Sequence, residues 1–305
     1  MILDYNYSKN TKRLTISYIN EKGQKDMLNF NNINRFKTYY YTPEGEFDTY
    51  DGAKAGIRYT DDPSKFDLKE YIMELPQKYR DLINQETFPR LYTFDIEVMM
   101  SPDGTYSEAS VGGNPITTIS VVSPELDCIV MGTREIDQDK LDWINKQFRK
   151  YVSENKFFQT LEMEVPKFRY VKFATEKDML EEFLKIVSKV PVIAGWNSIK
   201  YDWQYIVNRI KTFYPELSIN LCSVTHQTKM KNHTSTIGKE KIRLPMPVHT
   251  LIVDMMAVIE EDNVVMPIKE SLGLDYIAEE SVQANKIKYK KSLGNLYEED
   301  YPRYV

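Results

Sequence analysis

Hydrophobic and polar positions change their period along the 305-residue chain, and the pattern predicts a protein with two α/β parts. In the first part, the alternating stretch 13–20 and the aromatic run 36–42 predict strands with turns after them. Residues 67–83 predict two short helices, separated at Pro76 because proline interrupts a helix. We therefore expect a small α+β domain over residues 1–89.

From residue 90 onward, short apolar and β-branched runs alternate with longer amphipathic stretches. The strand-like runs are RLYTFDIEV, ITTISVV, CIVMG, FRYVKFA, VPVIAGW and VHTLIVD, and the helical stretches are 137–154, 176–188, 203–213 and 268–278. The first three runs have short connections and predict an antiparallel meander, whereas the later ones alternate with helices and predict parallel additions. The spacing of Thr175 and Asp178 predicts a capping box at the second helix. We expect a mixed sheet flanked by helices over residues 90–305.

Composition limits the classes of function only weakly. Hydrophobic residues make up 42% and charged residues 28%, as in ordinary globular proteins. The net charge of −5 argues against a generally basic nucleic-acid binder, although a nuclease needs acidic residues in its cleft. Two cysteines exclude a disulfide framework and a Cys-rich zinc site. No signal peptide and no membrane-spanning stretch is recognisable, so we expect a cytoplasmic protein with no membrane partner.

The first chemical feature is FDIE, in which Asp95 and Glu97 end an apolar strand. Side chains two apart on a strand point to the same face. Two carboxylates held so close raise each other's pKa unless a cation lies between them, and hard oxygen ligands suit Mg²⁺ or Mn²⁺. An isolated D-x-E is more often simply the solvent-facing end of a strand.

The second feature is GWNSIKYDWQYIVNRI, in which an apolar strand leads to Asn197 and an amphipathic helix opens at Tyr201 and Asp202. Taken alone, Asp202 is explained as an acid at a helix start, and Asn197 as a turn residue. Together with FDIE, however, the two elements supply what a two-metal phosphodiesterase needs, namely acids from separate elements around one cleft.

These residues resemble the first two exonuclease motifs of family B DNA polymerases, FDIE and N-x-x-x-Y/F-D, and most resemble those of T-even-type phages. The resemblance extends in order over nearly the whole chain, through MSPDG, NPITTISV, FATEKDMLEEFLKIV and SLGLDYIAEESV. It implies a ribonuclease H-like 3′→5′ exonuclease domain over residues 90–305, preceded by the polymerase N-terminal domain over residues 1–89.

The resemblance also implies roles for individual residues in proofreading with two Mg²⁺ or Mn²⁺ ions. Asp95 and Glu97 would hold the metal that carries the nucleophilic water, and Asp202 would help to hold the second. Asn197 would support the cleft near the scissile nucleotide, with Tyr201 packed beside it. Met99 or Met100, just past FDIEV, is a candidate wedge against the terminal base. The implied partners are single-stranded DNA at a primer 3′ end, a C-terminal polymerase portion and a sliding clamp.

A polar, basic stretch at residues 226–243 falls where the phage polymerases carry a β-hairpin that helps to move the primer end. Its lysines are candidate phosphate contacts: Lys229, Lys231, Lys239 and Lys241. A solvated surface loop explains this stretch equally well.

The third exonuclease motif of the family, Y-x-x-x-D, is not found. Tyr297 and Asp300 have the wrong separation, and NLYEEDYPRYV resembles the segment just before that motif. A polymerase split between two genes, an interrupted gene and a fragment all fit this pattern. We expect proofreading that needs a C-terminal complement. The alternatives are a non-catalytic module that binds single-stranded DNA or the rest of a polymerase, and a self-sufficient exonuclease.

Overall fold

The computed structural model describes residues 1–49, 51–101, 103–160, 165–234, 241–261, 270–283 and 292–305. The chain forms two compact units, Met1–Pro89 and Arg90–Val305. In the part of the chain so described, no helix combines the length and apolarity needed to cross a bilayer.

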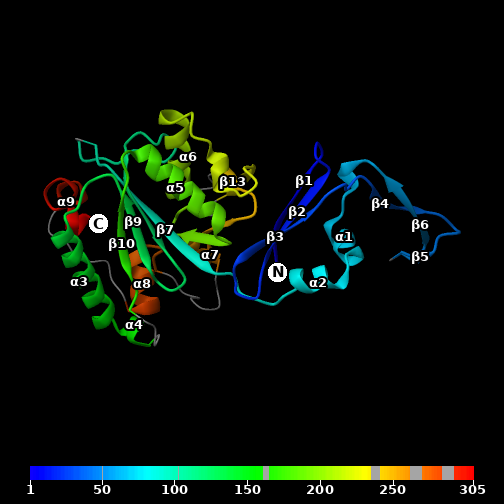
Figure 1. Cartoon of the computed structure of the whole chain (residues 1–305), viewed down its shortest axis with the longest axis horizontal. Coiled ribbons are helices and arrows are strands. Elements are labelled where there is room, and N and C mark those ends of the chain that lie inside the picture. Colours follow the sequence, from blue (N-terminus) through cyan, green and yellow to red (C-terminus); the bar gives the residue numbers. More distant parts are fainter. Residues whose placement is uncertain (50, 102, 161–164, 235–240, 262–269, 284–291) are drawn as a thin grey trace. The chain divides into compact units, whose positions relative to one another are not determined.

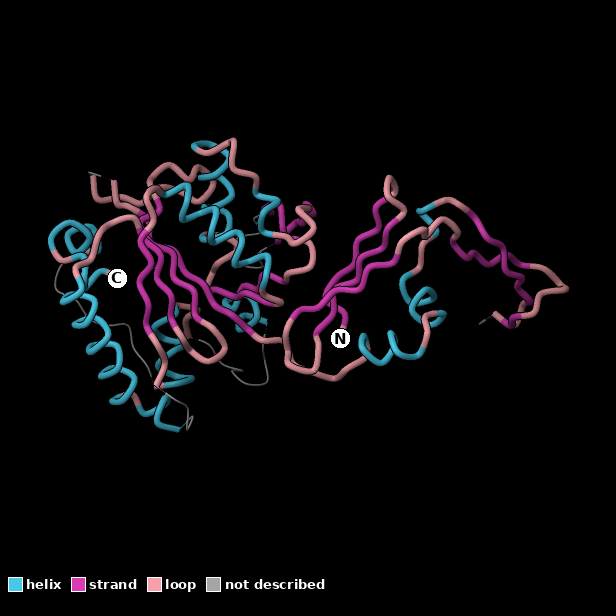
Figure 2. The backbone as a smooth tube through the Cα atoms, in the orientation of Figure 1, coloured by secondary structure: helices cyan, strands magenta, loops and turns pink. Residues whose placement is uncertain are grey.

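The first unit combines two small antiparallel sheets with two short helices (Figure 2). Its sheets have the strand orders β1-β2-β3 and β4-β6-β5. The elements are β1 Ile2–Ser8, β2 Arg13–Ile19, β3 Lys25–Phe30, β4 Phe36–Tyr41, β5 Phe47–Asp48, β6 Lys54–Thr60, a 3₁₀ turn Pro63–Lys65, α1 Leu68–Glu74 and α2 Gln77–Ile83. Pro76 separates the helices as predicted, and Asp67 caps α1 by accepting hydrogen bonds from the N–H groups of Lys69 and Glu70. A core around Leu14, Ile16 and Ile83 confirms a small α+β unit.

The second unit is built on a six-stranded mixed sheet with helices on both faces (Figures 1 and 2). The strand order is β10-β9-β8-β7-β11-β14. The strands are β7 Leu91–Val98, β8 Ile116–Val122, β9 Cys128–Gly132, β10 Phe168–Lys172, β11 Val192–Gly195 and β14 Leu251–Asp254. The first three strands are antiparallel, and β10, β11 and β14 each pair in parallel with a neighbour. The predicted meander with parallel additions is therefore confirmed.

Helices α5 (Glu176–Lys189) and α6 (Asp202–Phe213) cover one face of this sheet (Figure 1). Their apolar stripes join β7 and β8 in the main core, where the rings of Phe94 and Phe183 lie 5.4 Å apart. The N-cap bond of the predicted capping box is present, because Thr175 Oγ1 accepts the N–H of Asp178, while the Asp178 carboxylate accepts the Thr175 hydroxyl at 2.8 Å instead of the backbone N–H. Helix α3 (Gln138–Glu154) lies beside β10 in a separate cluster with the C-terminal helices.

The remaining elements were predicted incompletely. They are α4 Lys156–Thr160, a 3₁₀ turn Ile219–Cys222, β12 Thr228–Thr234, β13 Lys241–Pro247, α7 Met255–Glu261, α8 Leu274–Val282, α9 Leu293–Glu299 and α10 Tyr301–Tyr304. The helix expected over 268–278 begins only at Leu274, because Gly273 is extended with ψ 136°. It continues to Val282 and ends where Gln283 adopts a left-handed conformation with φ 51°. Position 268 lies outside the described residues.

Candidate active site

The acid pair of the first motif lies on β7, whose side chains alternate strictly between two environments. Phe94, Ile96 and Val98 are buried in the main core. Asp95 is exposed and Glu97 is half-buried on the opposite face. The same alternation that fills the core therefore places both carboxylates together on the face of β7 that points away from the main core.

The third acid joins this pair because β11 is shorter than β7. The two strands pair only as far as Thr93 opposite Ala194. Beyond that point, the N–H of Ile96 donates a hydrogen bond to Oδ1 of Asp202 at 3.2 Å. Asp202, the first residue of α6, is only 4% exposed. Burial, and after it the negative charge of Asp95, raises the pKa of Asp202 to about 8.

The turn between β11 and α6 is tightly packed. A Cβ on Gly195 would lie 2.7 Å from Cβ of Ser198 and 2.8 Å from the backbone oxygen of Phe94. Asn197 has φ 54°, a left-handed conformation that asparagine tolerates better than most residues. Its side-chain oxygen is buried and has no hydrogen-bond partner among the described residues. Because an unsatisfied buried acceptor is costly, this oxygen is available to a donor that approaches the turn.

A fourth acid, Asp254, supports this turn from the end of β14. It is 7% exposed and lies beside Gly195 in the parallel ladder. Its Oδ2 accepts the N–H of Ile199 at 3.2 Å, and its Oδ1 accepts the N–H of Met256 at 3.1 Å. Its negative charge is also a minor contributor to the raised pKa of Asp202. Sequence reasoning missed Asp254, although an acid ending the apolar run VHTLIVD repeats the signal of FDIE.

Tyr201 lies among the same charged groups. Burial, followed by the charges of Tyr205, Asp202, Tyr106 and Glu97, raises the pKa of Tyr201 to about 12. Its ring lies 5.7 Å from that of Tyr205. Tyr201 therefore packs against Tyr205 at the start of α6, next to Asp202.

Met99 begins the segment that follows β7. It is half-buried, and its N–H donates to the carbonyl of Pro115 at 2.9 Å. Its carbonyl accepts the side-chain amide of Asn114 at 2.8 Å. These bonds close the segment into a loop directly beyond Glu97.

The basic stretch forms an antiparallel hairpin of β12 and β13. All four described basic side chains of the strands are exposed, but Lys229 and Lys231 lie on the hairpin face where β13 contributes to the main core, and Lys241 and Arg243 lie on the other face. The structure therefore divides these basic residues between two faces, and it adds Arg243 to the candidates. Lys239 lies outside the described residues.

The carboxylate oxygens of Asp95, Glu97 and Asp202 suit a divalent cation chemically, although the three side chains do not form a compact cluster. Within the described ranges, no three Asp, Glu, His or Cys side chains form a group that could hold a metal ion. Asp95 and Asp202 are nevertheless close enough for the charge of one to raise the pKa of the other. Two coupled carboxylates are the kind of hard ligand that Mg²⁺ and Mn²⁺ prefer. The residues therefore fit a divalent cation in donor chemistry and in charge.

Comparison with known proteins identifies the family. Residues 56–277, more than half of the chain, match the family model described as DNA polymerase family B, exonuclease domain. The DNA-directed DNA polymerase of Escherichia phage RB69 is 28% identical over 220 residues, which cover 71% of this chain and 24% of that polymerase. The DNA-directed DNA polymerase of Enterobacteria phage T4 is 28% identical over 139 residues, which cover 45% of this chain and 15% of that polymerase. The chain thus spans about a quarter or less of these relatives, and it belongs to the family B DNA polymerases through their exonuclease domain.

Proposed function

We propose that this chain is the proofreading part of a replicative DNA polymerase and hydrolyses DNA from a mispaired primer 3′ end. The observation that carries this proposal is the convergence of Asp95 and Asp202, from separate elements, with Glu97 on the same face of β7 as Asp95. Residues 90–305 would form the 3′→5′ exonuclease domain, and residues 1–89 the N-terminal domain of the polymerase.

Asp95, Glu97 and Asp202 would hold two divalent cations, with Mg²⁺ or Mn²⁺ as the candidates. When bound, such cations supply an activated water and stabilise the leaving 3′ oxygen. Asp202 must give up its proton to act as a ligand, which its raised pKa opposes until a positive charge is present. The buried oxygen of Asn197 offers an acceptor in the turn that precedes Asp202, and Tyr201 provides an aromatic ring directly before Asp202.

DNA would be held by the residues around these acids and by the hairpin. We include Met99, at the start of the loop beyond Glu97, and the basic residues Lys229, Lys231, Lys239 and Lys241. Lysines bind phosphates without sequence preference, which suits an enzyme that must accept any primer end. A C-terminal polymerase portion, or a separate polymerase subunit, and a sliding clamp are the proposed protein partners.

A second candidate is a non-catalytic module that binds single-stranded DNA or the rest of a polymerase. The observation in its favour is that no three potential metal ligands are gathered among the described residues. Against it stands the cost of keeping Asp202 buried beside Asp95, since two acids that repel phosphate bring no advantage to a pure binding site.

The decisive experiment is degradation of an end-labelled single-stranded oligonucleotide with Mg²⁺. The purified chain would be tested alone and with the polymerase portion, beside Asp95→Ala and the matched control Asp142→Ala, which removes an exposed acid on α3. We expect Asp95→Ala to lower the rate by at least about 100-fold, because even residues that only support metal ligands cost about 10–100-fold. Asp142→Ala should cleave at the wild-type rate. DNA binding without cleavage in every combination would replace the catalytic proposal with the binding module.

A further inference from the structure

The described residues between β7 and β8, 99–101 and 103–115, form a loop, here called the 99–115 loop, that is fastened to one face of α6. The hydroxyl of Tyr205 accepts the N–H of Asn114 at 2.9 Å and donates to the carbonyl of Asn114 at 2.8 Å. The side-chain amide of Asn208 donates to the carbonyl of Ala109 at 2.8 Å. Since residues three apart lie on the same face of a helix, both bonds hold the loop against one side of α6.

The closest contact is at Gly112, where the loop touches the helix backbone. Gly112 has φ 61°, and a Cβ there would lie 2.6 Å from the backbone nitrogen of Arg209. The guanidinium of Arg209 donates from NH1 to the carbonyl of Gly113 at 2.8 Å and to that of Gly112 at 3.4 Å. The loop backbone is therefore both packed on α6 and hydrogen-bonded to its arginine.

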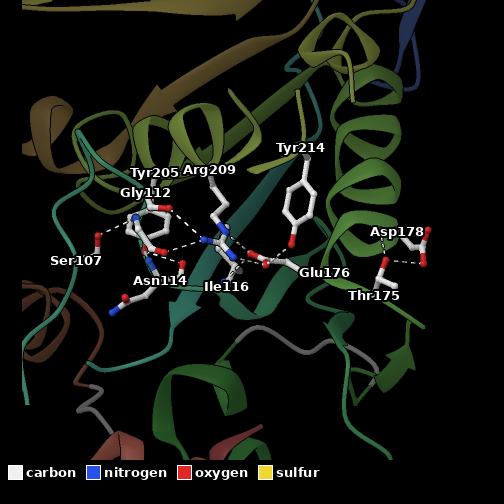
Figure 3. Close-up of polar contacts among 11 residues, drawn as sticks. Ser107, Gly112, Asn114, Ile116, Thr175, Glu176, Asp178, Tyr205, Arg209 and Tyr214 are labelled. Atoms are coloured by element: carbon white, nitrogen blue, oxygen red, sulfur yellow. Dashed lines mark hydrogen bonds and ion pairs between the residues drawn. The ribbon is translucent and has the colours of Figure 1, made fainter. Parts of the chain in front are cut away.

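Glu176, the first residue of α5, fixes this guanidinium (Figure 3). Its two carboxylate oxygens accept Nε and NH2 of Arg209 at 2.9 and 2.8 Å. The same carboxylate accepts the N–H of Ile116, which begins β8, and the hydroxyl of Tyr214, both at 2.7 Å. The side chains of Arg209 and Glu176 are only 6% and 10% exposed, so this charge-assisted fork is sheltered from water.

The fastened loop runs alongside the acids. It begins two residues after Glu97, and the side chain of Asn114 closes it by bonding the carbonyl of Met99 at 2.8 Å. Tyr205, which bonds the backbone of Asn114 in the loop, has its ring 5.7 Å from that of Tyr201, the residue before Asp202. A shift of the loop would therefore change one wall of the site and leave the acids on β7 and α6.

We propose that Arg209, acting with Glu176, is a positioning residue that fixes the 99–115 loop beside the acids for binding of the DNA 3′ end. The role in binding the DNA 3′ end rests on the proposed function, whereas the anchoring of the loop by Arg209 does not. Arg209 is not a catalytic residue, because its contacts are with Glu176 and the loop backbone. It would affect binding of the substrate rather than the hydrolytic step.

The test compares Arg209→Lys with Tyr214→Phe as a matched control. Lysine keeps the charge beside Glu176, but as a point donor it cannot bond both carboxylate oxygens and the loop carbonyls together. Tyr214→Phe removes one hydrogen bond to the same carboxylate without touching the loop. Gly112→Ala is a second, charge-neutral variant, which should push the loop away from α6 because the added Cβ meets backbone.

Two readouts separate anchoring from function. Hydrogen–deuterium exchange should rise in peptides covering 99–115 in Arg209→Lys and Gly112→Ala, with α5 peptides unchanged, and should stay at the wild-type level in Tyr214→Phe. With Ca²⁺ in place of Mg²⁺, the Kd for a labelled single-stranded oligonucleotide should rise about tenfold in the first two variants only. Where cleavage is measurable, KM should rise with little change in kcat, as expected for lost uniform binding.

Equal exchange across the whole unit in Arg209→Lys and Tyr214→Phe, with equal Kd values, would overturn the inference in favour of a structural ion pair. Wild-type protein that neither binds nor cleaves DNA would overturn the proposed function instead. In that case, selective exchange in the loop would still support the anchoring by Arg209, and uniform exchange would refute it.

Discussion

At the scale of single residues, the candidate site contains a buried acid, Asp202, whose ionised form is energetically unfavourable in the folded protein. Asp202 is buried, its Oδ1 accepts the N–H of Ile96, and its carboxylate feels the charges of Asp95 and Asp254. These conditions favour the protonated acid near neutral pH and the carboxylate once a cation arrives. Asp202 therefore links pH to stability and, in the proposed function, to cation binding.

This linkage predicts how Asp202→Asn should behave. The pKa of Asp202 is raised from 3.8 to about 8 by folding, so the folded protein holds a proton that the unfolded chain has lost between these values. The free energy of unfolding therefore falls as pH rises through this window. In EDTA, Asp202→Asn should melt at about the wild-type temperature near pH 4 and several degrees above it near pH 8. Thermal melts of both proteins across this pH range provide the measurement.

Mg²⁺ should stabilise the wild type most at high pH, where in EDTA the wild type melts below Asp202→Asn. The ion must displace the proton at low pH but not at high pH, so the Mg²⁺-induced rise in Tm should be larger above pH 8 than near pH 6. Asp202→Asn should lose most of that rise. A wild-type response to Mg²⁺ that is independent of pH, or that persists in the variant, would show that Asp202 is not a ligand.

At the scale of elements, the hairpin of β12 and β13 offers a second prediction. Lys241 and Arg243 are exposed on one side of it, and Lys229 and Lys231 are exposed on the side where β13 contributes Leu244 and Met246 to the core. The double change Lys241→Gln/Arg243→Gln should reduce the slope of log K for single-stranded DNA against log salt by about 1.4, or about 0.7 for each lost phosphate contact. Lys146→Gln/Arg149→Gln, which removes two exposed basic residues on α3, is the matched control and should leave the slope unchanged. Equal slopes for the wild type and both variants would show that DNA does not contact Lys241 and Arg243.

Elements with a clear period were predictable from the sequence, and those set by tertiary contacts were not. The alternation in β7 predicted which face carries Asp95 and Glu97, and the strand-then-helix pattern predicted the meander and its parallel additions. Asp254 escaped notice because its partner, the N–H of Ile199, is 55 residues away in the chain. The loop anchored by Arg209 was equally invisible, since an arginine inside an amphipathic helix normally predicts a solvated face.

At the scale of the whole molecule, the proposed cation ligands and the anchored loop belong to one unit. The acids of the candidate site and the Arg209 network lie within Arg90–Val305, and the cores of the two units share no residue. Residues 90–305 expressed alone should therefore fold and keep the pH-dependent Mg²⁺ effect on Tm, because a domain with its own core can fold independently. The family match begins at residue 56, inside the first unit, so the shorter chain also tests whether that unit contributes to the site. If the isolated unit melts cooperatively but its Tm no longer responds to Mg²⁺, residues 90–305 are not sufficient for the cation effect. The proposal that this unit alone holds the cations would then be wrong.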